Sequence, residues 1–538
     1  MGLDESFWRY KMNCLIMLIG YAWPPGWWPQ YGADAQHTRV QLMRGNMTSA
    51  PSVIGVSLSG GSESEGPVIA PGWIFLEYDY GNPAGIVAVS YTDTYQVAWR
   101  WDYANIPAQG SALVVWDVDN DGTLEVLHSN HYATQDTGSV FCRTATSGAL
   151  EWWGPYNKLY PSSPTIYDLD GNGITEIFFG CMSHDTLYCI NSNGSLRWKS
   201  PKPSGGGDMN YAPAIGQVIP GGAPEIVITS GEYIAMYNAN TGTLIASLDM
   251  GTWDAVPKSA PAIADVNKDG TMEVFVHTES PDSLWCLRPS GASFAVVWVQ
   301  QIPSGGNHNK QGIGIADVNG DGWLDVIVGS GGTSSGYPTL YDRVHCFRGY
   351  DGTVIWRSGV LAGDVHRGVA IADIDGDNRW EVIAQTIPGW IYCLAGENGA
   401  IQWQVELPSC SDAHDVSIGD ADNDGCSEIV TAGHGGSRLW VLDRAGTNCG
   451  YVPAAEEAER GETYLKAWFS GGALRVISPH VGDAVIGVYE PTGRTVLLRK
   501  IALARGENAI ALDLQTGVYV GIVRCGGETV RIKFVLRK

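Results

Sequence analysis

Short apolar runs alternate with polar turns through most of the chain, and the turns are rich in glycine, asparagine and aspartate. In one stretch, the apolar run 163–167 leads into an acidic loop, and β-rich runs follow at 176–180 and 186–190. An Asn-Gly turn then precedes a run that ends in Trp198. The spacing shows no helical periodicity, so it predicts four short antiparallel strands.

This order of strands, loop and tryptophan recurs along the chain. The acidic loops, or their equivalents, begin at positions 117, 168, 217, 265, 317, 373 and 420. A copy without acids precedes them near Gly66–Ala70. Four short strands in a period of about 50 residues are typical of a β-propeller blade. The sequence therefore predicts an all-β, eight-bladed β-propeller, with a seven-bladed ring as the alternative.

Two further features concern how the blades join. The last repeat lacks a fourth strand that ends in tryptophan, while the run Ser52–Leu58 has no blade of its own. Pairing these two would satisfy both open edges and close the ring. The tryptophans at the blade ends are expected to be wedged between neighbouring blades; they are Trp99, Trp152, Trp198, Trp298, Trp356 and Trp403.

Six of the loops place oxygen-bearing side chains at positions 1, 3, 5 and 9, usually with glycine at position 6. Ca²⁺ accepts six to eight oxygens in a loose geometry, and an acid at position 9 that enters a strand separates these loops from EF-hands. The alternative is a solvated turn rich in aspartate and asparagine. We predict about six structural Ca²⁺ sites, with the ligands Asp117, Asp119, Asp121, Glu125, Asp168, Asp170, Asn172, Glu176, Asp265, Asn267, Asp269, Glu273, Asp317, Asn319, Asp321, Asp325, Asp373, Asp375, Asp377, Glu381, Asp420, Asp422, Asp424 and Glu428.

Composition supports this interpretation and excludes others. The chain has 538 residues and a formal net charge of -24, and 21 of its 57 acids lie in the six loops. Such acidity disfavours binding to nucleic acid. Residues 1–22 resemble a secretory signal peptide, with a buried N-terminal strand as the alternative. No other long apolar run exists, so we expect no membrane span.

Five of the 11 cysteines fall at the same place in the third strand of their repeats: Cys142, Cys189, Cys286, Cys346 and Cys393. Equivalent positions of different blades are too far apart for a disulfide, so we expect these five to be reduced and buried. Disulfides are expected among Cys181, Cys410, Cys426, Cys449 and Cys525, or between Cys181 and Cys189.

With these motifs in hand, residues 60–450 resemble the FG-GAP/VCBS-type repeat propellers that also occur in integrin α-chains. The segment Trp28–Thr38 is similar to the lead-in of many secreted bacterial propellers of this kind. The resemblance implies calcium-binding blades. The repeats that begin near residues 66 and 217 lack the full acidic loop, so calcium is not expected in those two.

The repeat pattern stops near Gly450, and residues 451–460 have the composition of a linker. Residues 461–538 predict a small immunoglobulin-like β-sandwich. Gly517–Tyr519 and Lys533–Val535 resemble parts of the C-terminal sorting domain of type IX secretion. That resemblance implies export through the outer-membrane secretion machinery to the cell surface or medium. A plain accessory domain is the alternative. The expected domains are thus 1–22, 23–450, 451–460 and 461–538.

Two classes of function compete at this stage. The preferred hypothesis is a secreted or surface module without catalysis, whose propeller face binds an extracellular glycan or protein. The alternative is a calcium-dependent polysaccharide lyase, because Gly306–Asn309 resembles a segment of rhamnogalacturonan lyases. The loops before the first strand of each blade should line the central opening, which makes His308, His366, Arg367, His414, Lys310, Asp208 and Trp253 candidate ligand-binding residues.

Overall fold

The computed structural model divides into two compact units, Met1–Val452 and Pro453–Lys538. It describes residues 25–58, 66–78, 85–102, 112–130, 139–156, 162–181, 186–253, 255–257, 259–279, 282–302, 312–331, 341–365, 367–387, 389–410, 412–434, 438–450, 466–470, 473–478, 482–489, 495–503, 506–512, 517–525 and 528–536.

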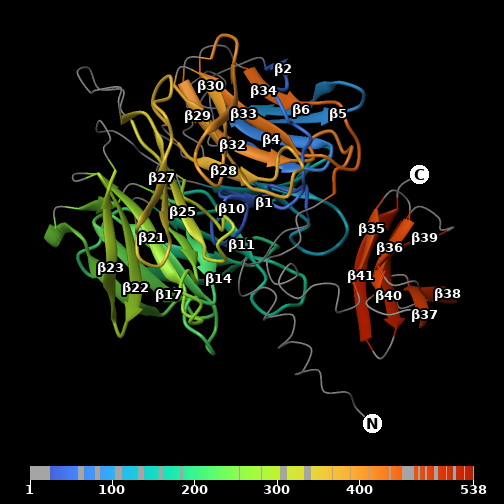
Figure 1. Ribbon diagram of the computed structural model, residues 1–538. Helices are drawn as coiled ribbons and strands as arrows, with labels where there is room; N and C mark the ends of the chain where they lie inside the picture. The colour runs from blue at the N-terminus through green and yellow to red at the C-terminus, as the bar shows by residue number, and fades with distance from the viewer. Residues whose placement is uncertain are drawn as a thin grey trace. The chain divides into compact units, whose positions relative to one another are not determined.

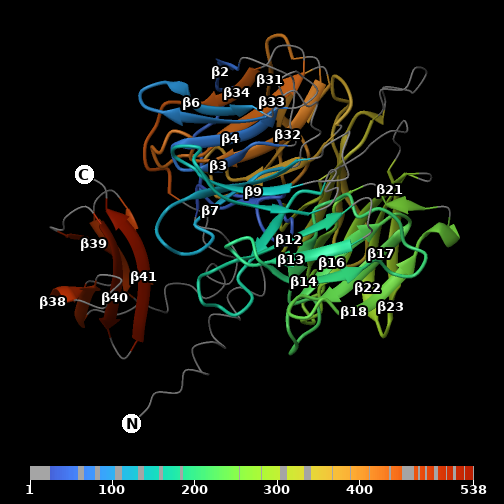
Figure 2. The same cartoon turned by 180° about the vertical axis from the view of Figure 1, so that it is seen from behind.

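The first unit is built from eight antiparallel sheets that follow one another in chain order (Figures 1 and 2). Blades 1 to 4 comprise β3 (Val68–Ala70), β4 (Trp73–Tyr78), β5 (Gly85–Tyr91) and β6 (Tyr95–Asp102); β7 (Val114–Trp116), β8 (Glu125–Asn130), β9 (Ser139–Thr144) and β10 (Leu150–Pro155); β11 (Thr165–Tyr167), β12 (Glu176–Cys181), β13 (Thr186–Ile190) and β14 (Leu196–Pro201); and β15 (Ala214–Gly216), β16 (Glu225–Ser230), β17 (Tyr233–Asn238) and β18 (Leu244–Asp249).

Blades 5 to 8 repeat this plan with small additions. They comprise β19 (Val256–Pro257), β20 (Ala262–Ala264), β21 (Glu273–Glu279), β22 (Ser283–Ser290) and β23 (Ser293–Gln301), preceded by the 3-10 turn η1 (Gly251–Trp253); β24 (Gly314–Ala316), β25 (Asp325–Gly329), β26 (Val344–Arg348) and β27 (Val354–Arg357); β28 (Val369–Ala372), β29 (Glu381–Thr386), β30 (Trp390–Ala395) and β31 (Ile401–Glu406), with β1 (Val40–Gln41) beside β28; and β32 (Asp412–Gly419), β33 (Glu428–His434), β34 (Arg438–Asp443) and β2 (Ser52–Ser57).

The ring closes as the sequence predicts. Strand β2, from before the first repeat, pairs with β34 as the fourth strand of blade 8, so N- and C-terminal strands share one sheet. This pairing covers the edge that β34 would otherwise leave open. The eight-bladed prediction is confirmed, and the seven-bladed alternative is wrong.

Tryptophans at the blade ends join one blade to the next. The Trp298 indole in blade 5 donates a hydrogen bond to the Gly349 carbonyl in blade 6, and its ring lies over Gly352 in the turn of that blade. The same bond runs from Trp99, Trp198, Trp356 and Trp403 to carbonyls beyond their own blades. These contacts confirm the wedge role predicted for the tryptophans.

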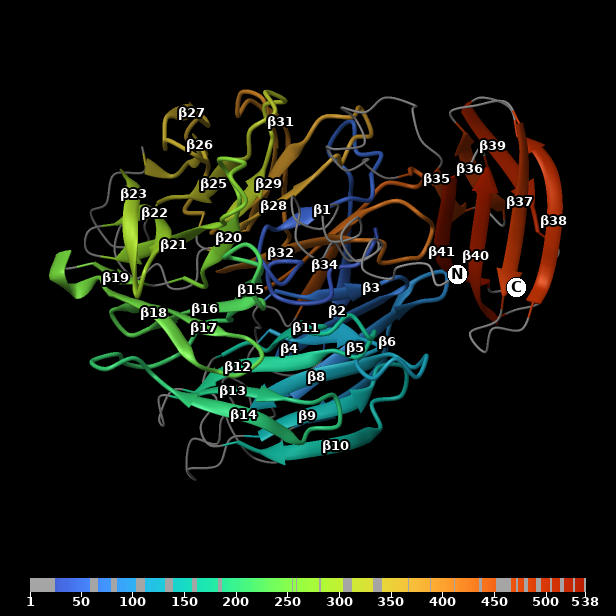
Figure 3. The ribbon, with the colours of Figure 1, turned by 90° about the horizontal axis from the view of Figure 1, so that it is seen from below.

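The centre of the ring is occupied by the chain itself. The first strands of neighbouring blades contact one another and are therefore the innermost strands. The segment Trp28–Gln41, which we call the axial strap, runs past them in turn, and Figure 3 shows β1 at this inner position. The strap bonds to Ile69, Val115, Ile166, Ile215, Ile263, Ile315, Ile371 and Ile418, one residue in each blade.

Gly26, two residues before the strap, and Gln41, at the end of the strap, both bond to blade 8. Gly26 accepts a hydrogen bond from the Asp420 amide of blade 8, and Gln41 contacts Ile418 of the same blade. The Gln41 side chain also accepts a bond from the Gly26 amide, at 3.0 Å. The strap thus passes all eight blades, and most of its residues are buried. The segment Trp28–Thr38, noted in the sequence as a lead-in, therefore fills the middle of the propeller.

Cysteines follow the prediction in part. The five third-strand cysteines are buried and reduced, which confirms the expectation. Cys426 and Cys449 form a disulfide, as one of the pairings left open. Cys181 and Cys189 are both reduced, so the alternative pairing between them is wrong.

The second unit contains two antiparallel sheets. One is formed by β35 (Lys466–Ser470), β36 (Ala473–Ser478) and β39 (Gly506–Ala511), and the other by β37 (Gly482–Tyr489), β38 (Thr495–Leu503), β40 (Gly517–Cys525) and β41 (Glu528–Leu536). Leu474, Val476, Ile486, Val488 and Val523 are among the side chains of its own buried core. Its immunoglobulin-like character stays a prediction.

Candidate metal centre

Each acidic loop connects the first two strands of its blade, and backbone amides hold its first and last acids. In blade 2, the Gly122 amide donates to Asp117 Oδ2 at 3.1 Å, and the Val118 amide donates to Glu125 Oε2 at 2.9 Å. Glu225 keeps the second of these bonds in blade 4, where the other acids are missing. The position 9 acid therefore shapes the loop whether or not a cation binds.

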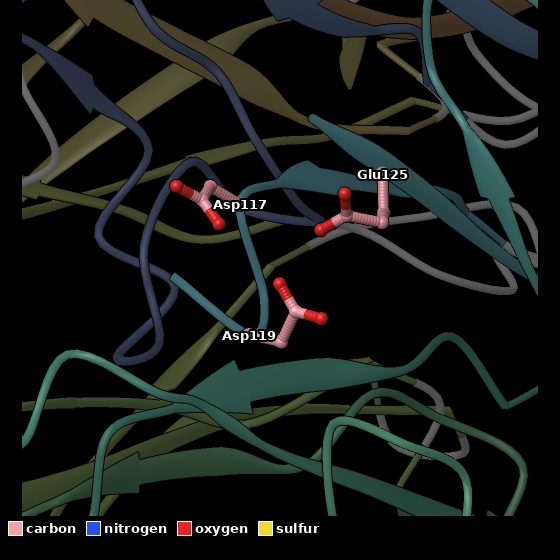
Figure 4. A group of neighbouring side chains, drawn as sticks. All are labelled: Asp117, Asp119 and Glu125. Atoms are coloured by element: carbon pink, nitrogen blue, oxygen red, sulfur yellow. The ribbon is translucent and has the colours of Figure 1, made fainter. Parts of the chain in front are cut away.

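Among the described residues, three loops bring the acids of positions 1, 3 and 9 together. In each, one ligand atom per residue lies within 4.8 Å of the others, and Figure 4 shows the three carboxyl groups of blade 2 turned toward a common point. The acids at position 5 are not part of these groups; Asp121, for example, accepts the Thr123 amide at 2.7 Å. The groups are Asp117, Asp119 and Glu125; Asp373, Asp375 and Glu381; and Asp420, Asp422 and Glu428.

Burial and mutual repulsion make these acids hard to ionise without a cation. Burial, and after it the charges of Glu151, Asp119 and Asp117, raise the pKa of Glu125 to about 8. Burial together with Asp375 and its neighbours raises the pKa of Glu381 to about 8. In blade 4, burial raises the pKa of Glu225 only to about 6. A bound cation would remove the repulsion that separates these cases.

The other three loops differ in what faces their acids. Arg197 forms an ion pair with Glu176 in blade 3, and Arg288 pairs with Asp269 and lies 4.0 Å from Glu273 in blade 5. In blade 6, Asp325 Oδ1 is buried and lacks a hydrogen-bond partner. Position 3 is an asparagine, Asn267 or Asn319, in blades 5 and 6. An arginine already supplies positive charge in blades 3 and 5, whereas blade 6 keeps an oxygen that a cation would satisfy.

Most of the predicted ligand-binding residues lie outside the described residues. This holds for His308, Lys310 and His366, and for the side chains of Trp253 and His414. Asp208 is exposed in the loop between β14 and β15, and Arg367 is half-buried just before β28. The Arg367 carbonyl accepts a bond from the Gly312 amide. A shared ligand face stays a prediction.

Sequence reasoning missed the polar residues of the axial strap. Arg39 is 1% exposed; it donates to the Val369 carbonyl at 2.5 Å and pairs with Asp415 at 3.1 Å. His37 donates from Nδ1 to the Pro261 carbonyl at 2.8 Å, because a carbonyl can only accept, and burial lowers the pKa of His37 to about 4. The sequence feature that could have indicated these residues is a polar segment without periodicity, placed just before the first repeat.

Comparison with known proteins supports the repeat and the fold. The chain carries FG-GAP-like repeats, matched over residues 265–328 and 317–384. A search of curated proteins found no match. The structure resembles the quinohemoprotein alcohol dehydrogenase of Comamonas testosteroni, with a TM-score of 0.58, 10% identity and 83% of each chain covered.

Two other solved structures resemble it to a similar degree. A quinohemoprotein alcohol dehydrogenase of Pseudomonas putida HK5 gives a TM-score of 0.56 at 11% identity, covering 83% of this chain and 84% of that one. A europium-containing methanol dehydrogenase gives 0.54 at 12% identity, covering 77% and 91%. At such identities, the likeness establishes the eight-bladed propeller fold alone.

These neighbours contradict the functional expectation from the sequence. The predicted glycan- or protein-binding module, with a polysaccharide lyase as the alternative, is wrong, because the propellers that match are dehydrogenases. The physical reason is that the repeats and acidic loops specify a scaffold, and a scaffold of this kind carries unrelated functions. In the described residues, no helix is long and apolar enough to cross a membrane, as expected.

Proposed function

We propose that the first unit is a calcium-dependent propeller scaffold, in which the acidic loops hold Ca²⁺ and fix the first hairpin of their blades. The observation that carries this proposal is the convergence of three carboxylates within 4.8 Å in blades 2, 7 and 8. The orphaned buried oxygens Asp325 Oδ1, Asp420 Oδ1 and Glu428 Oε1 support it, since each needs a positive or donating partner.

The donor set favours calcium over other metals. The groups offer carboxylate oxygens only, without the thiolates and imidazoles that zinc prefers. The middle residues of the loops are largely exposed, so water has access to the carboxylates, which suits the six to eight oxygens of Ca²⁺ better than the strict octahedron of Mg²⁺. When bound, the ion would cancel the repulsion between the acids of positions 1, 3 and 9.

Occupancy should differ between blades. Blades 2, 7 and 8 each combine three converging acids, but in blade 7 Arg44 Nε lies 2.9 Å from Asp373 Oδ2 and already contributes positive charge. Blades 3 and 5 have arginines on their acids. We therefore propose strong sites in blades 2 and 8 and weaker sites in blades 3, 5, 6 and 7, in place of six equal sites.

Export remains part of the proposal. The disulfide between Cys426 and Cys449 supports an oxidising compartment, where such bonds persist. The compact unit Pro453–Lys538 supports a separate role for the tail, such as the sorting function that its sequence resembles. The dehydrogenase activity of the structural neighbours is not carried over, because identities of 10–12% establish the fold alone.

Thermal unfolding of metal-free protein tests the proposal. Because a ligand that binds only the folded state stabilises it by mass action, adding Ca²⁺ should raise the Tm by several degrees, and equal Mg²⁺ should raise it less. Asp117→Asn, in the converging group of blade 2, should reduce the Ca²⁺ effect. Asp249→Asn, in blade 4, which lacks the full acidic loop, serves as the matched control. An equal Tm with and without Ca²⁺ would rule the proposal out.

A further inference from the structure

The acidic loop of blade 8 is tied by a disulfide to the segment that follows β34, the third strand of the blade. Cys426 stands at position 7 of this loop, and its partner Cys449 lies six residues after the end of β34. Threonine, isoleucine, tryptophan or arginine stands at position 7 of the other five acidic loops. A covalent link at this position therefore distinguishes blade 8 from the other blades with acidic loops.

Residues 448–450 run along the loop beside this disulfide. The Asn448 amide donates to the Asp424 carbonyl at 3.0 Å, and the Cys449 amide donates to the Gly425 carbonyl at 2.9 Å. Asn448 is exposed and Cys449 is half-buried, so burial contributes little to holding this segment. Exposed backbone hydrogen bonds open readily. We therefore expect the disulfide to keep the segment on the loop.

The seam segment, residues 43–47, is inserted between the loops of blades 7 and 8. Elsewhere the amide at position 8 of a loop donates directly to the carbonyl at position 2 of the preceding loop, at 2.9 Å between blades 2 and 3 and at 3.0 Å between blades 4 and 5. In blade 8, the Ser427 amide donates instead to the Arg44 carbonyl at 2.9 Å. The Met47 amide donates to the Ile374 carbonyl of blade 7 at 2.8 Å. The seam segment thus replaces a direct contact between two loops.

Arg44 connects the disulfide-linked residues to both loops. Its amide donates to the Gly450 carbonyl at 2.9 Å, next to Cys449. Its Nε lies 2.9 Å from Oδ2 of Asp373, which belongs to the converging group of blade 7. A chain of contacts therefore runs from residues 448–450 through Arg44 to two acidic loops, and the disulfide fixes one end of this chain.

We infer that the disulfide between Cys426 and Cys449 is a redox-sensitive latch that sets the cation affinity of the blade 8 loop. Cys426 lies in the chain between Asp422 and Glu428, two acids of the converging group. A loop that is already held in its binding conformation loses less freedom when the ion binds. Breaking the disulfide frees the loop and should weaken the site. The inference rests on the proposed function, because it concerns the regulation of one proposed cation site.

The redox step is an ordinary thiol–disulfide exchange. A dithiol reductant gives two electrons and two protons to the bond between Cys426 and Cys449, so that both become thiols while the reductant becomes a disulfide. The half-buried Cys449 provides access for the reductant, since Cys426 is only 1% exposed. The blade 8 site would be weak in a reducing compartment and would strengthen after oxidation.

Calcium titration of the full chain, oxidised and reduced with dithiothreitol, tests the latch. Thiol labelling and mass spectrometry of the peptides with Cys426 and Cys449 confirm each redox form. We expect reduction to weaken one Ca²⁺ site per chain about tenfold, an ordinary size for coupled sites. Cys449→Ser should bind Ca²⁺ as the reduced protein does and should no longer respond to dithiothreitol.

Two further variants assign the affected site to its blade. Asp422→Asn impairs the blade 8 loop, so reduction should then leave the remaining Ca²⁺ binding unchanged. Asp117→Asn impairs the blade 2 loop instead and should keep the response to reduction. Both substitutions remove one loop carboxylate at a converging group, so they are matched in charge and differ in blade.

The redox equilibrium of the disulfide gives a reciprocal readout. If oxidation raises the Ca²⁺ affinity tenfold, Ca²⁺ must make the disulfide tenfold harder to reduce. For a two-electron couple this lowers the reduction potential by about 30 mV. Glutathione buffers with and without Ca²⁺ measure the shift, which Asp422→Asn should abolish.

The outcomes separate the latch from the calcium scaffold. Equal Ca²⁺ binding by both redox forms, or a loss of Ca²⁺ only when reduction unfolds the whole propeller, overturns the inference. In either case a Tm increase of the oxidised protein with Ca²⁺ leaves the proposed function standing. No Ca²⁺ bound by either form refutes the proposed function, and with it the latch.

Discussion

Single side chains decide what the repeated loops can bind. The motif is almost the same in six blades, yet arginines bring positive charge to three of them and a further acid brings negative charge to two others. These residues are Arg197, Arg288 and Arg44, and Glu151 and Asp443. The motif itself could be predicted from the sequence, because its spacing repeats. Its neighbours could not, because a cross-strand partner is fixed by register and lies outside the loop.

The raised carboxyl pKa values predict how metal-free protein responds to pH. In the folded state the pKa of Glu381 is about 8, against an ordinary value of 4.5, mainly through burial. The folded state then binds the proton more tightly, so this stabilisation is complete below pH 4.5 and is lost as the pH rises to about 8. We expect the Tm of metal-free protein to fall over this range and the Tm of Ca²⁺-loaded protein to fall less. A metal-free Tm that rises toward pH 8 would contradict this.

Arg39 in the axial strap gives a second prediction at this scale. Arg39→Met leaves Asp415 buried without its partner and should lower the free energy of unfolding by about 3–5 kcal/mol. The double change with Asp415→Asn should recover part of the loss. Arg379→Met removes an exposed pair with Glu397 and should cost about 1 kcal/mol or less. Chemical denaturation measures all three, and equal losses in the two single variants would argue against a structural strap.

At the scale of the element, each blade repeats the same strands, and a tryptophan in the last strand contacts the next blade, as Trp298 does. Each third-strand cysteine lies opposite the blade-end tryptophan, as Cys286 does opposite Trp298. A small buried residue there leaves room for the indole. The sequence indicated both positions by their recurrence. The glycines beneath five of the rings could not be singled out, because the chain has 69 glycines and only the packing distinguishes them.

The glycine under the tryptophan gives a prediction with an internal control. Gly352 has a φ of +70°, and a Cβ there would lie 2.7 Å from the Trp298 ring. Gly221 has a φ of +82° and nothing near its Cβ position. Both Gly→Ala changes carry the left-handed backbone cost of about 1–2 kcal/mol. Gly352→Ala should cost about 1–3 kcal/mol more through overpacking. Similar unfolding free energies for the two variants would mean that the wedge is loose.

At the scale of the whole molecule, the ring could be predicted and its centre could not. Eight repeats and an unpaired strand at each end specify closure, because an open edge is costly. The axial strap has no periodicity, and its partners Ile69 and Ile371 are far apart in sequence. Only the assembled ring brings them to one axis. The functional expectation failed for a related reason, since repeats specify a scaffold and leave its use open.

The two units give a prediction about truncation. A chain that ends at Gly450 keeps every propeller strand and the disulfide of Cys426 with Cys449. Because the tail has its own core, we expect the truncated propeller to keep its Tm and its Ca²⁺ response. Calorimetry of both lengths checks this. A truncated chain that does not fold would show that the tail belongs to the propeller.

The central claim is that the acidic loops hold calcium, and anomalous X-ray diffraction from crystals grown with Ca²⁺ tests it most directly. We predict anomalous peaks in blades 2 and 8, with oxygens of Asp117, Asp119 and Glu125, and of Asp420, Asp422 and Glu428, at about 2.3–2.6 Å from the ion. Peaks in blades 3 and 5 should be weaker or missing, because Arg197 and Arg288 contact their acids. Loops without any anomalous peak at saturating Ca²⁺ would contradict the account.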